Sequence, residues 1–106
     1  MATQKYREVF CRRLNQARTA KGLSQKTLGI LAGIDEFVAS TRINRYEKGV
    51  HEADIGTVQK LAQVLEVPLA FFYTNDDCLA EIIIGFDKLP SSVKQSIHKL
   101  VQESIN

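Results

Sequence analysis

The spacing of apolar residues constrains the fold of this chain more than any other feature of its sequence. Through most of the 106 residues, apolar side chains recur at intervals of three and four, the periodicity of helices that bury one face. Only two prolines and six glycines interrupt this pattern. The sequence therefore predicts an all-α protein.

Caps and breakers divide the pattern into short helices. Gly22, Gly33 and Gly49 mark the ends of the first three, and Ser24 and Asp54 are suitable N-caps for the second and the fourth. The expected helices cover residues 5–21, 25–32, a segment that ends at 48, 55–66, 68–72, 79–88 and a final segment that reaches 105.

The same periodicity assigns side chains to the interior. We expect Tyr6 and Leu31 on the inner faces of the first two helices. We also expect Tyr73 in the core beside Phe71 and Phe72, rather than on a surface that stacks on nucleic acid.

Residues 74–106 are expected to form a helical hairpin that breaks at Pro90. Ser92 with Gln95 has the form of a capping box for the last helix. The run Ile82–Ile84 is compatible with a strand because its residues are β-branched. A lone strand has no evident partner here, so we favour a helix.

Charge is unevenly distributed along the chain. Residues 1–50 contain 10 Lys and Arg against 4 Asp and Glu, whereas residues 51–106 contain 4 against 8. The basic first half favours contact with a polyanion. No apolar run approaches the length of a membrane span, and the polar N-terminus lacks the apolar core of a signal peptide. We therefore expect a cytoplasmic protein without a membrane partner.

Residues for catalysis or metal binding do not form a recognisable set. Cys11 and Cys78 are far apart, and neither His51 nor His98 has a second ligand at helical spacing. We therefore expect no enzyme activity, no metal and no cofactor.

The most specific signal lies in residues 23–49, which contain a short helix, a glycine turn and a second helix. The positions that carry a resemblance are Phe10, Leu14, Ala17, Arg18, Lys21, Gly22, Leu23, Ser24, Gln25, Leu28, Ala32, Gly33, Ile34, Ile43, Tyr46, Glu47, Gly49, Thr57, Val58, Leu61, Ala62, Leu65, Val67, Pro68 and Leu69. In this order they resemble the Cro/CI-type (XRE) helix-turn-helix family over roughly residues 6–73. The resemblance implies a five-helix, lambda-repressor-like DNA-binding bundle in residues 1–73, with residues 74–106 as a helical extension.

The third helix has two distinct faces. Ala39, Ile43 and Tyr46 lie on one side and should face the core. The other side is polar and basic, and consists of Ser40, Thr41, Asn44, Arg45 and Lys48. Such a face suits hydrogen bonds to bases and phosphates, although for an isolated helix simple solvation would explain it as well.

The resemblance also implies roles for single residues at the DNA. Ser24 and Gln25 would contact phosphate, and Gln25 would also brace the recognition helix. The positions implied to face bases are Ser40, Thr41 and Arg45. The positions implied to contact phosphates or to flank the site are Arg42, Asn44 and Lys48.

Other positions have structural roles. Arg18 and Glu47 match a family pair that ties the first helix to the end of the third through a partly buried ion pair. Gly49 is expected to adopt φ > 0 after that helix. Arg12 and Arg13 either add to the positive field or are simply solvated at the surface.

Residues 35–38 depart from the family pattern, because the segment before the recognition helix is longer than usual by about one helical turn. We expect Phe37 and Val38 to pack inward and anchor this insertion. Gly29 stands where alanine is common, which permits a closer contact between helices.

The leading hypothesis is a sequence-specific double-stranded DNA-binding transcriptional regulator, with repression of a palindromic operator by a homodimer as the expected mode. The apolar surface around the three isoleucines is wider than one neighbouring helix covers, which favours a dimer. The residues assigned to it are Leu79, Ile82, Ile83, Ile84 and Phe86. A hairpin that buries them within one monomer is the other reading. The alternative function is an antitoxin-like or other protein-interaction module with secondary DNA binding, whose acidic half docks a small protein partner.

Overall fold

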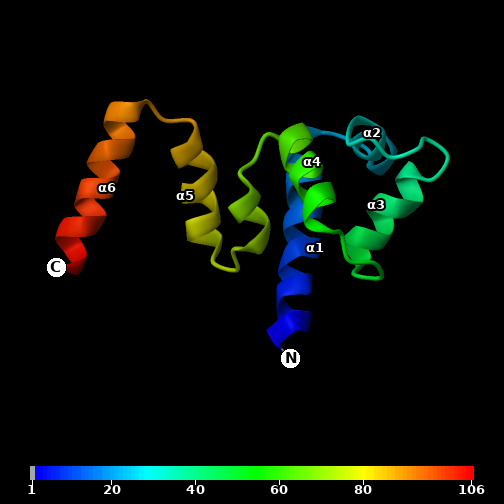
Figure 1. Ribbon diagram of the computed structural model, residues 1–106, viewed down its shortest axis with the longest axis horizontal. Coiled ribbons are helices and arrows are strands. Elements are labelled where there is room, and N and C mark those ends of the chain that lie inside the picture. Colours follow the sequence, from blue (N-terminus) through cyan, green and yellow to red (C-terminus); the bar gives the residue numbers. More distant parts are fainter. Residues whose placement is uncertain (1) are drawn as a thin grey trace.

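The computed structural model describes residues 2–106, and its regular elements there are all helices (Figure 1). The all-α prediction is confirmed, including a helix at Ile82–Ile84. The elements are α1 (Ala2–Lys21), α2 (Gln25–Leu31), α3 (Ala39–Lys48), α4 (Ile55–Leu65), the 3₁₀ helix η1 (Leu69–Tyr73), α5 (Asp77–Asp87) and α6 (Ser91–Ile105). Within the described residues, no helix combines the length and the apolar character needed to cross a bilayer.

Side-chain caps fix where three of these helices begin. Ser24 caps α2, Asp54 caps α4 and Asp76 caps α5, each accepting a hydrogen bond from the backbone N–H three residues later. These bonds satisfy N–H groups that have no partner inside the helix. The caps at Ser24 and Asp54 are those that the sequence predicts.

One apolar core joins α1, α2, α3, α4 and η1, and Ala80 of α5 completes it. Figure 1 shows α1 in the middle, with α2 and α3 to one side and η1 and α5 to the other. The largest fully buried apolar side chains are Phe72, Leu14, Leu28, Ile43, Leu61 and Val58. The core therefore fixes α3 against α1 and α2.

Three helical side chains that the sequence assigns to the interior are exposed instead. Tyr6 is 60% exposed, because the N-terminal end of α1 projects beyond the other helices (Figure 1). Leu31 is 59% exposed at the end of α2, a helix that buries Leu28 on its inner side. Tyr73 is 42% exposed, because a 3₁₀ helix has about three residues per turn and cannot direct three consecutive side chains inward.

Arg13 is buried, so the expectation of a surface role for it is wrong. Its Nε donates to Thr74 O at 2.9 Å, and its Nη1 donates to Gln16 Oε1 at 2.9 Å. Its Nη2 lies 3.0 Å from Asp77 Oδ1, an ion pair without the geometry of a hydrogen bond. The guanidinium carbon lies 5.5 Å from the centre of the Phe71 ring. Together these contacts attach the start of α5 to α1.

The C-terminal helices form an open hairpin. α5 packs on η1, with Ala80 buried and with Ile83 and Ile84 half-buried against the core. α6 buries none of its residues and lies at one end of the molecule (Figure 1). The radius of gyration, 15.5 Å, therefore exceeds the roughly 13 Å of a compact chain of this length. The expected capping box of Ser92 and Gln95 is wrong, because the N-cap residue of α6 is Pro90, two positions before Ser92, and no side chain caps this helix.

Gly29 packs directly against Ala39 where α2 meets α3. A Cβ atom at position 29 would lie 2.7 Å from Ala39 Cβ and 3.1 Å from its Cα. We therefore expect Gly29→Ala to lower the free energy of unfolding by about 1–3 kcal/mol, although alanine has the higher helix propensity. Urea denaturation measures the change.

Gly85→Ala is the matched control for this substitution. Gly85 also lies within a helix, and nothing lies within 4 Å of a Cβ atom added there. We expect this variant to gain about 0.5–1 kcal/mol from helix propensity alone. A Gly29→Ala variant as stable as Gly85→Ala would contradict the close packing of α2 on α3.

Candidate nucleic-acid interface

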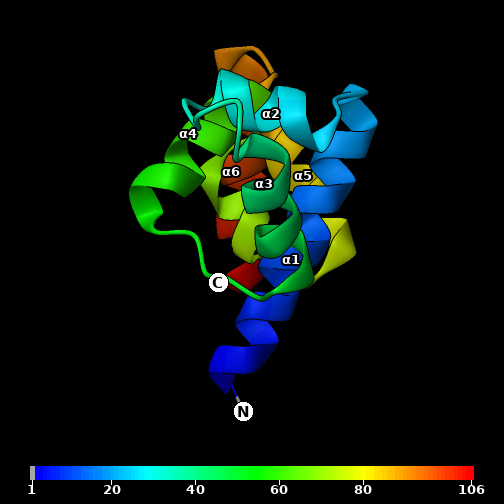
Figure 2. The same ribbon diagram turned by 90° about the vertical axis from the view of Figure 1, so that its right-hand side faces the viewer.

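α3 and the segment before it lie at the front of the molecule in Figure 2, with α2 above them. Ala39, Ile43 and Tyr46 are buried, as their spacing predicts, so the opposite side of α3 is directed outward. The residues of α3 that the sequence assigns to contact with DNA are all exposed: Ser40, Thr41, Arg42, Asn44, Arg45 and Lys48.

The start of α2 borders this exposed side. Ser24 is exposed, and Gln25 is half-buried against α3. Gln25 Nε2 donates to Asn44 Oδ1 at 3.2 Å and to Glu47 Oε1 at 3.1 Å. The structure thus brings Gln25 and Asn44 together. Arg42 lies at the other edge of α3, where it lines a shallow pocket with residues of α4.

Arg18 and Glu47 tie α1 to the end of α3. Arg18 Nε lies 2.6 Å from Glu47 Oε2, and Arg18 Nη2 lies 3.1 Å from Oε1. The two side chains are 14% and 5% exposed. Arg18 also donates to Leu23 O, and Glu47 accepts from Asn15 and Gln25. Both oxygens of Glu47 are therefore engaged within the protein.

The pairing of Glu47 removes a negative charge from the exposed side of α3. Burial acts to raise the pKa of Glu47, but hydrogen bonds from Arg18, Asn15 and Gln25 outweigh burial and hold the pKa below its ordinary value of 4.5. The charges that α3 presents to solvent are then all positive: Arg42, Arg45 and Lys48.

The lowered pKa of Glu47 makes part of the folding stability depend on pH. A carboxyl group whose pKa is lower in the folded chain stabilises the fold above the unfolded pKa, and this contribution is lost as the pH falls through the folded value. We expect wild type to be more stable than Glu47→Gln at neutral pH, and the difference to shrink as the pH falls below about 4.5. Urea denaturation across this range checks it. A difference that does not change with pH would contradict the pairing.

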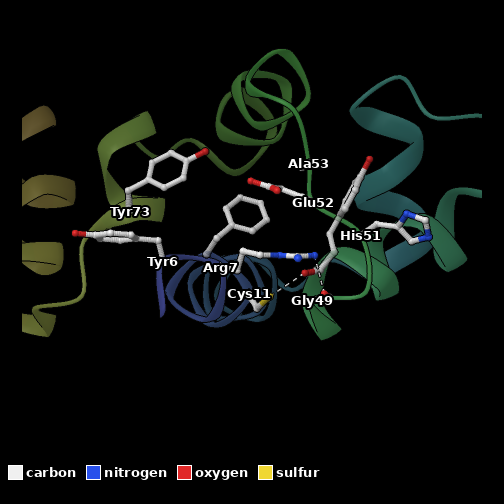
Figure 3. Close-up of a pocket in the computed structure, with 10 residues that line it drawn as sticks. Tyr6, Arg7, Cys11, Gly49, His51, Glu52, Ala53 and Tyr73 are labelled. Carbon is white, nitrogen blue, oxygen red and sulfur yellow. Dashed lines mark hydrogen bonds between the residues drawn. The ribbon is translucent and has the colours of Figure 1, made fainter. Parts of the chain in front are cut away.

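Two side chains of α1 hold the C-terminal end of α3 (Figure 3). Gly49 ends the helix with φ of 75°, as the sequence predicts. Arg7 Nη2 donates to Gly49 O at 2.8 Å, and Cys11 Sγ donates to Tyr46 O at 3.1 Å. Burial raises the pKa of the Cys11 thiol, which keeps it protonated and able to donate.

A cavity of about 170 Å³ adjoins these contacts. Figure 3 shows Tyr6 and Tyr73 at the end of this cavity opposite His51. The two tyrosines border the cavity rather than fill it, which is consistent with their exposure.

The inserted residues 35–38 do not pack inward. Phe37 is 88% exposed and Val38 is 43% exposed, so the expectation that they anchor the insertion is wrong. Asp35 orders the turn instead, because its Oδ1 accepts from Phe37 N at 2.9 Å and its carbonyl accepts from Val38 N at 3.0 Å. Local hydrogen bonds hold the backbone, and the apolar side chains are left in solvent.

The sequence does not predict that Arg7 and Cys11 hold the end of α3. A usable signal existed, because Arg7, Cys11 and Arg18 lie at i, i+4 and i+11 and therefore share one stripe of α1. The sequence already predicts that Arg18, on this stripe, contacts the end of the third helix. The spacing cannot show which distant carbonyl groups the other two meet.

Comparison with known proteins agrees with this geometry. The helix-turn-helix family model HTH_3 matches residues 14–72. Over 63 residues, the chain is 36% identical to uncharacterized HTH-type transcriptional regulators of Sinorhizobium medicae (strain WSM419) and Rhizobium meliloti (strain 1021). The match covers 59% of this chain and 42% of each relative, so the chain spans about two fifths of their length.

A solved structure extends the similarity beyond the matched helices. The crystal structure of the transcriptional regulator BswR superposes with a TM-score of 0.81 at 41% sequence identity, covering 88% of this chain and 92% of that chain. This share is larger than residues 1–73 contain, so the similarity reaches the C-terminal helices. The chain therefore belongs to the XRE-type helix-turn-helix family of transcriptional regulators.

Proposed function

We propose that this protein binds double-stranded DNA sequence-specifically and represses transcription as a homodimer on a palindromic operator. The observation that supports it most is the exposed polar and basic side of α3, in a chain of the helix-turn-helix family. A B-DNA major groove admits one α-helix, whose outward side chains reach base edges.

Each residue assigned to this interface then has a role at the DNA. Arg45 pairs with the O6 and N7 acceptors of a guanine, since its guanidinium can donate two parallel hydrogen bonds. Ser40 and Thr41 contact neighbouring bases. The remaining contacts are to phosphates and fix the position of the protein, and they come from Ser24, Gln25, Arg42, Asn44 and Lys48.

We infer that a second copy of the chain covers α6. This helix has 15 residues, and an isolated helix of that length is marginal in water unless its apolar side is covered. Its exposed apolar side chains are Val93, Leu100, Val101 and Ile105.

The neighbouring helix α5 also exposes apolar side chains. Leu79 and Ile82 are 47% and 51% exposed, and Phe86 follows on the same side, half-buried. Ile83 and Ile84, which the sequence also assigns to the dimer, contribute less because they are half-buried against the core of their own chain. A two-fold partner fits, because each copy then covers the surface of the other.

Such a dimer divides the chain into a DNA-binding part, residues 1–73, and a dimerising part, residues 74–106. Two α3 helices related by a two-fold axis would read inverted half-sites about one DNA turn apart, roughly 34–36 Å. Such a dimer would repress transcription when its operator overlaps a promoter, because the bound protein blocks access to the promoter DNA and needs no further protein contact.

Substitutions at Arg45 and Gln25 test the placement of the interface. We expect Arg45→Ala to lower affinity for a selected duplex by about 1–3 kcal/mol and to relax base preference at one position in each half-site. Gln25→Ala should weaken all duplexes similarly, because a phosphate contact carries no sequence information. Fluorescence anisotropy with labelled duplexes measures both. Wild-type binding by both folded variants would contradict the placement.

The same titrations should depend steeply on salt. With about 6–10 phosphate contacts, affinity is expected to fall roughly 10³–10⁵-fold between 50 and 200 mM salt, because bound counterions are released. A flat response would count against DNA as the ligand.

A further inference from the structure

Phe37 is a large apolar side chain held almost entirely in water, with 88% of it exposed. It lies in the turn that directly precedes the recognition helix α3. Val38, next to it, is also exposed, at 43%. Single exposed apolar residues are common on protein surfaces, so it is the position of this pair, next to the surface proposed to face DNA, that makes it a candidate contact.

The turn that carries Phe37 is ordered by hydrogen bonds on both sides. Asp35 Oδ1 accepts from Phe37 N at 2.9 Å, and Asp35 O accepts from Val38 N at 3.0 Å. Arg42 N donates to Val38 O at 2.8 Å, which joins the turn to the first turn of α3. The backbone of Phe37 is therefore fixed relative to the recognition helix.

The spacing along the chain predicts that Phe37 lies on the same side as the residues proposed to face DNA. Thr41, Asn44 and Lys48 follow it at i+4, i+7 and i+11, which is one stripe of a helix. The tight turn before α3 keeps this register approximately, because its hydrogen bond joins residues three apart. Val38, the N-cap residue, departs from helical φ at −120°. With the register kept only approximately, we expect Phe37 to lie about one turn before Thr41 along the stripe.

We propose that Phe37 contacts the 5-methyl group of a thymine in the major groove and adds a base preference to those of the polar residues. The inference rests on the proposed function, since it requires α3 in the groove. Thymine presents a methyl group among the base edges of the major groove, and phenylalanine is suited to contact it. A phenyl ring gains no hydrogen bond from phosphate oxygens or from the polar base edges.

Replacement of thymine by deoxyuridine tests the contact, because it removes only the methyl group. A duplex selected from random DNA by the wild-type protein is remade with each thymine replaced in turn. At one position per half-site, we expect wild-type affinity to fall about fourfold, the factor that corresponds to one buried methyl group, and about fifteenfold when both half-sites are changed.

The Phe37→Ala variant, measured on both the thymine and the deoxyuridine duplex, shows whether Phe37 is the residue that contacts the methyl group. On the thymine duplex, we expect this variant to lose at least the factor that deoxyuridine causes in wild type. We expect Phe37→Ala to bind the thymine duplex and the duplex with deoxyuridine at that position with equal affinity. Leu31→Ala is the control, since Leu31 is 59% exposed on α2 and lies outside the stripe. That variant should keep wild-type affinity and wild-type sensitivity to the methyl group.

Three outcomes would overturn the inference: wild type indifferent to every replacement, Phe37→Ala with unchanged affinity, or Phe37→Ala still sensitive at the same thymine. A wild-type protein that prefers no duplex at all is a different result. That result would contradict the proposed function itself, sequence-specific DNA binding, and not only the role of Phe37.

Discussion

Replacing Ile82 and Leu100 together by glutamate is expected to convert the proposed dimer into folded monomers and to weaken binding to a selected DNA duplex by about 10²–10⁴-fold. Both side chains are exposed in the single chain, at 51% and 64%, so the new charges do not disturb its core. In the dimer, the same positions would lie in an apolar interface, where unpaired carboxylates are costly. Operator binding then loses the gain that comes from engaging two half-sites at once.

The control is the pair Gln95→Glu and Gln102→Glu, which adds the same charge on the side of α6 opposite Leu100. We expect this variant to remain dimeric. Sedimentation equilibrium gives the mass of each form, and circular dichroism shows that each is folded. A monomeric wild type, or an Ile82→Glu/Leu100→Glu variant that stays dimeric, would contradict the assignment. A monomer whose α6 binds a different protein would favour the antitoxin-like alternative.

Arg18→Ala is expected to cost about 2–4 kcal/mol of folding stability, near the range for breaking a buried ion pair. The substitution leaves Glu47, 5% exposed, without the guanidinium that supplies two of its hydrogen bonds. For a domain of this size, the loss corresponds to a fall in Tm of roughly 10–20 °C. Thermal unfolding followed by circular dichroism measures it.

Two further variants separate this effect from a general loss of charge. Arg12→Ala breaks an ion pair with Asp77 whose side chains are 46% and 75% exposed, and should cost less than about 1 kcal/mol. Arg18→Met combined with Glu47→Leu removes both buried charges and should recover part of the loss. Equal stability of Arg18→Ala and Arg12→Ala would show that the pair has no structural importance.

Much of the fold could be predicted because its determinants are local. Ser24 and Asp54 cap helices through bonds to residues three positions away, and Gly49 ends α3 with the positive φ that glycine adopts most easily. The exposed side of α3 follows from the burial of Ile43 and Tyr46 and the helical period alone. These features require no knowledge of distant contacts.

The errors arise where burial depends on segments far apart in the sequence. Arg13 is buried because Thr74 and Asp77 meet it from more than 60 positions away, which no local pattern of an arginine-rich helix reveals. Phe37 is apolar and is therefore predicted to lie inside, yet no segment from elsewhere in the described chain covers it, and it is 88% exposed. Tyr6 belongs to the inner stripe of α1, yet it borders an open cavity with residues from distant segments and is 60% exposed.

Selection from random double-stranded DNA by the full-length protein, read by sequencing, tests the central claim most directly. With α3 in the major groove and a two-fold dimer, we predict an enriched inverted repeat whose half-sites are centred about 10–10.5 base pairs apart, or a multiple of this spacing. A parallel selection with Arg45→Ala should lose preference at one position in each half-site. Wild-type pools at low salt that show no sequence enriched over the starting library would contradict sequence-specific DNA binding by this protein.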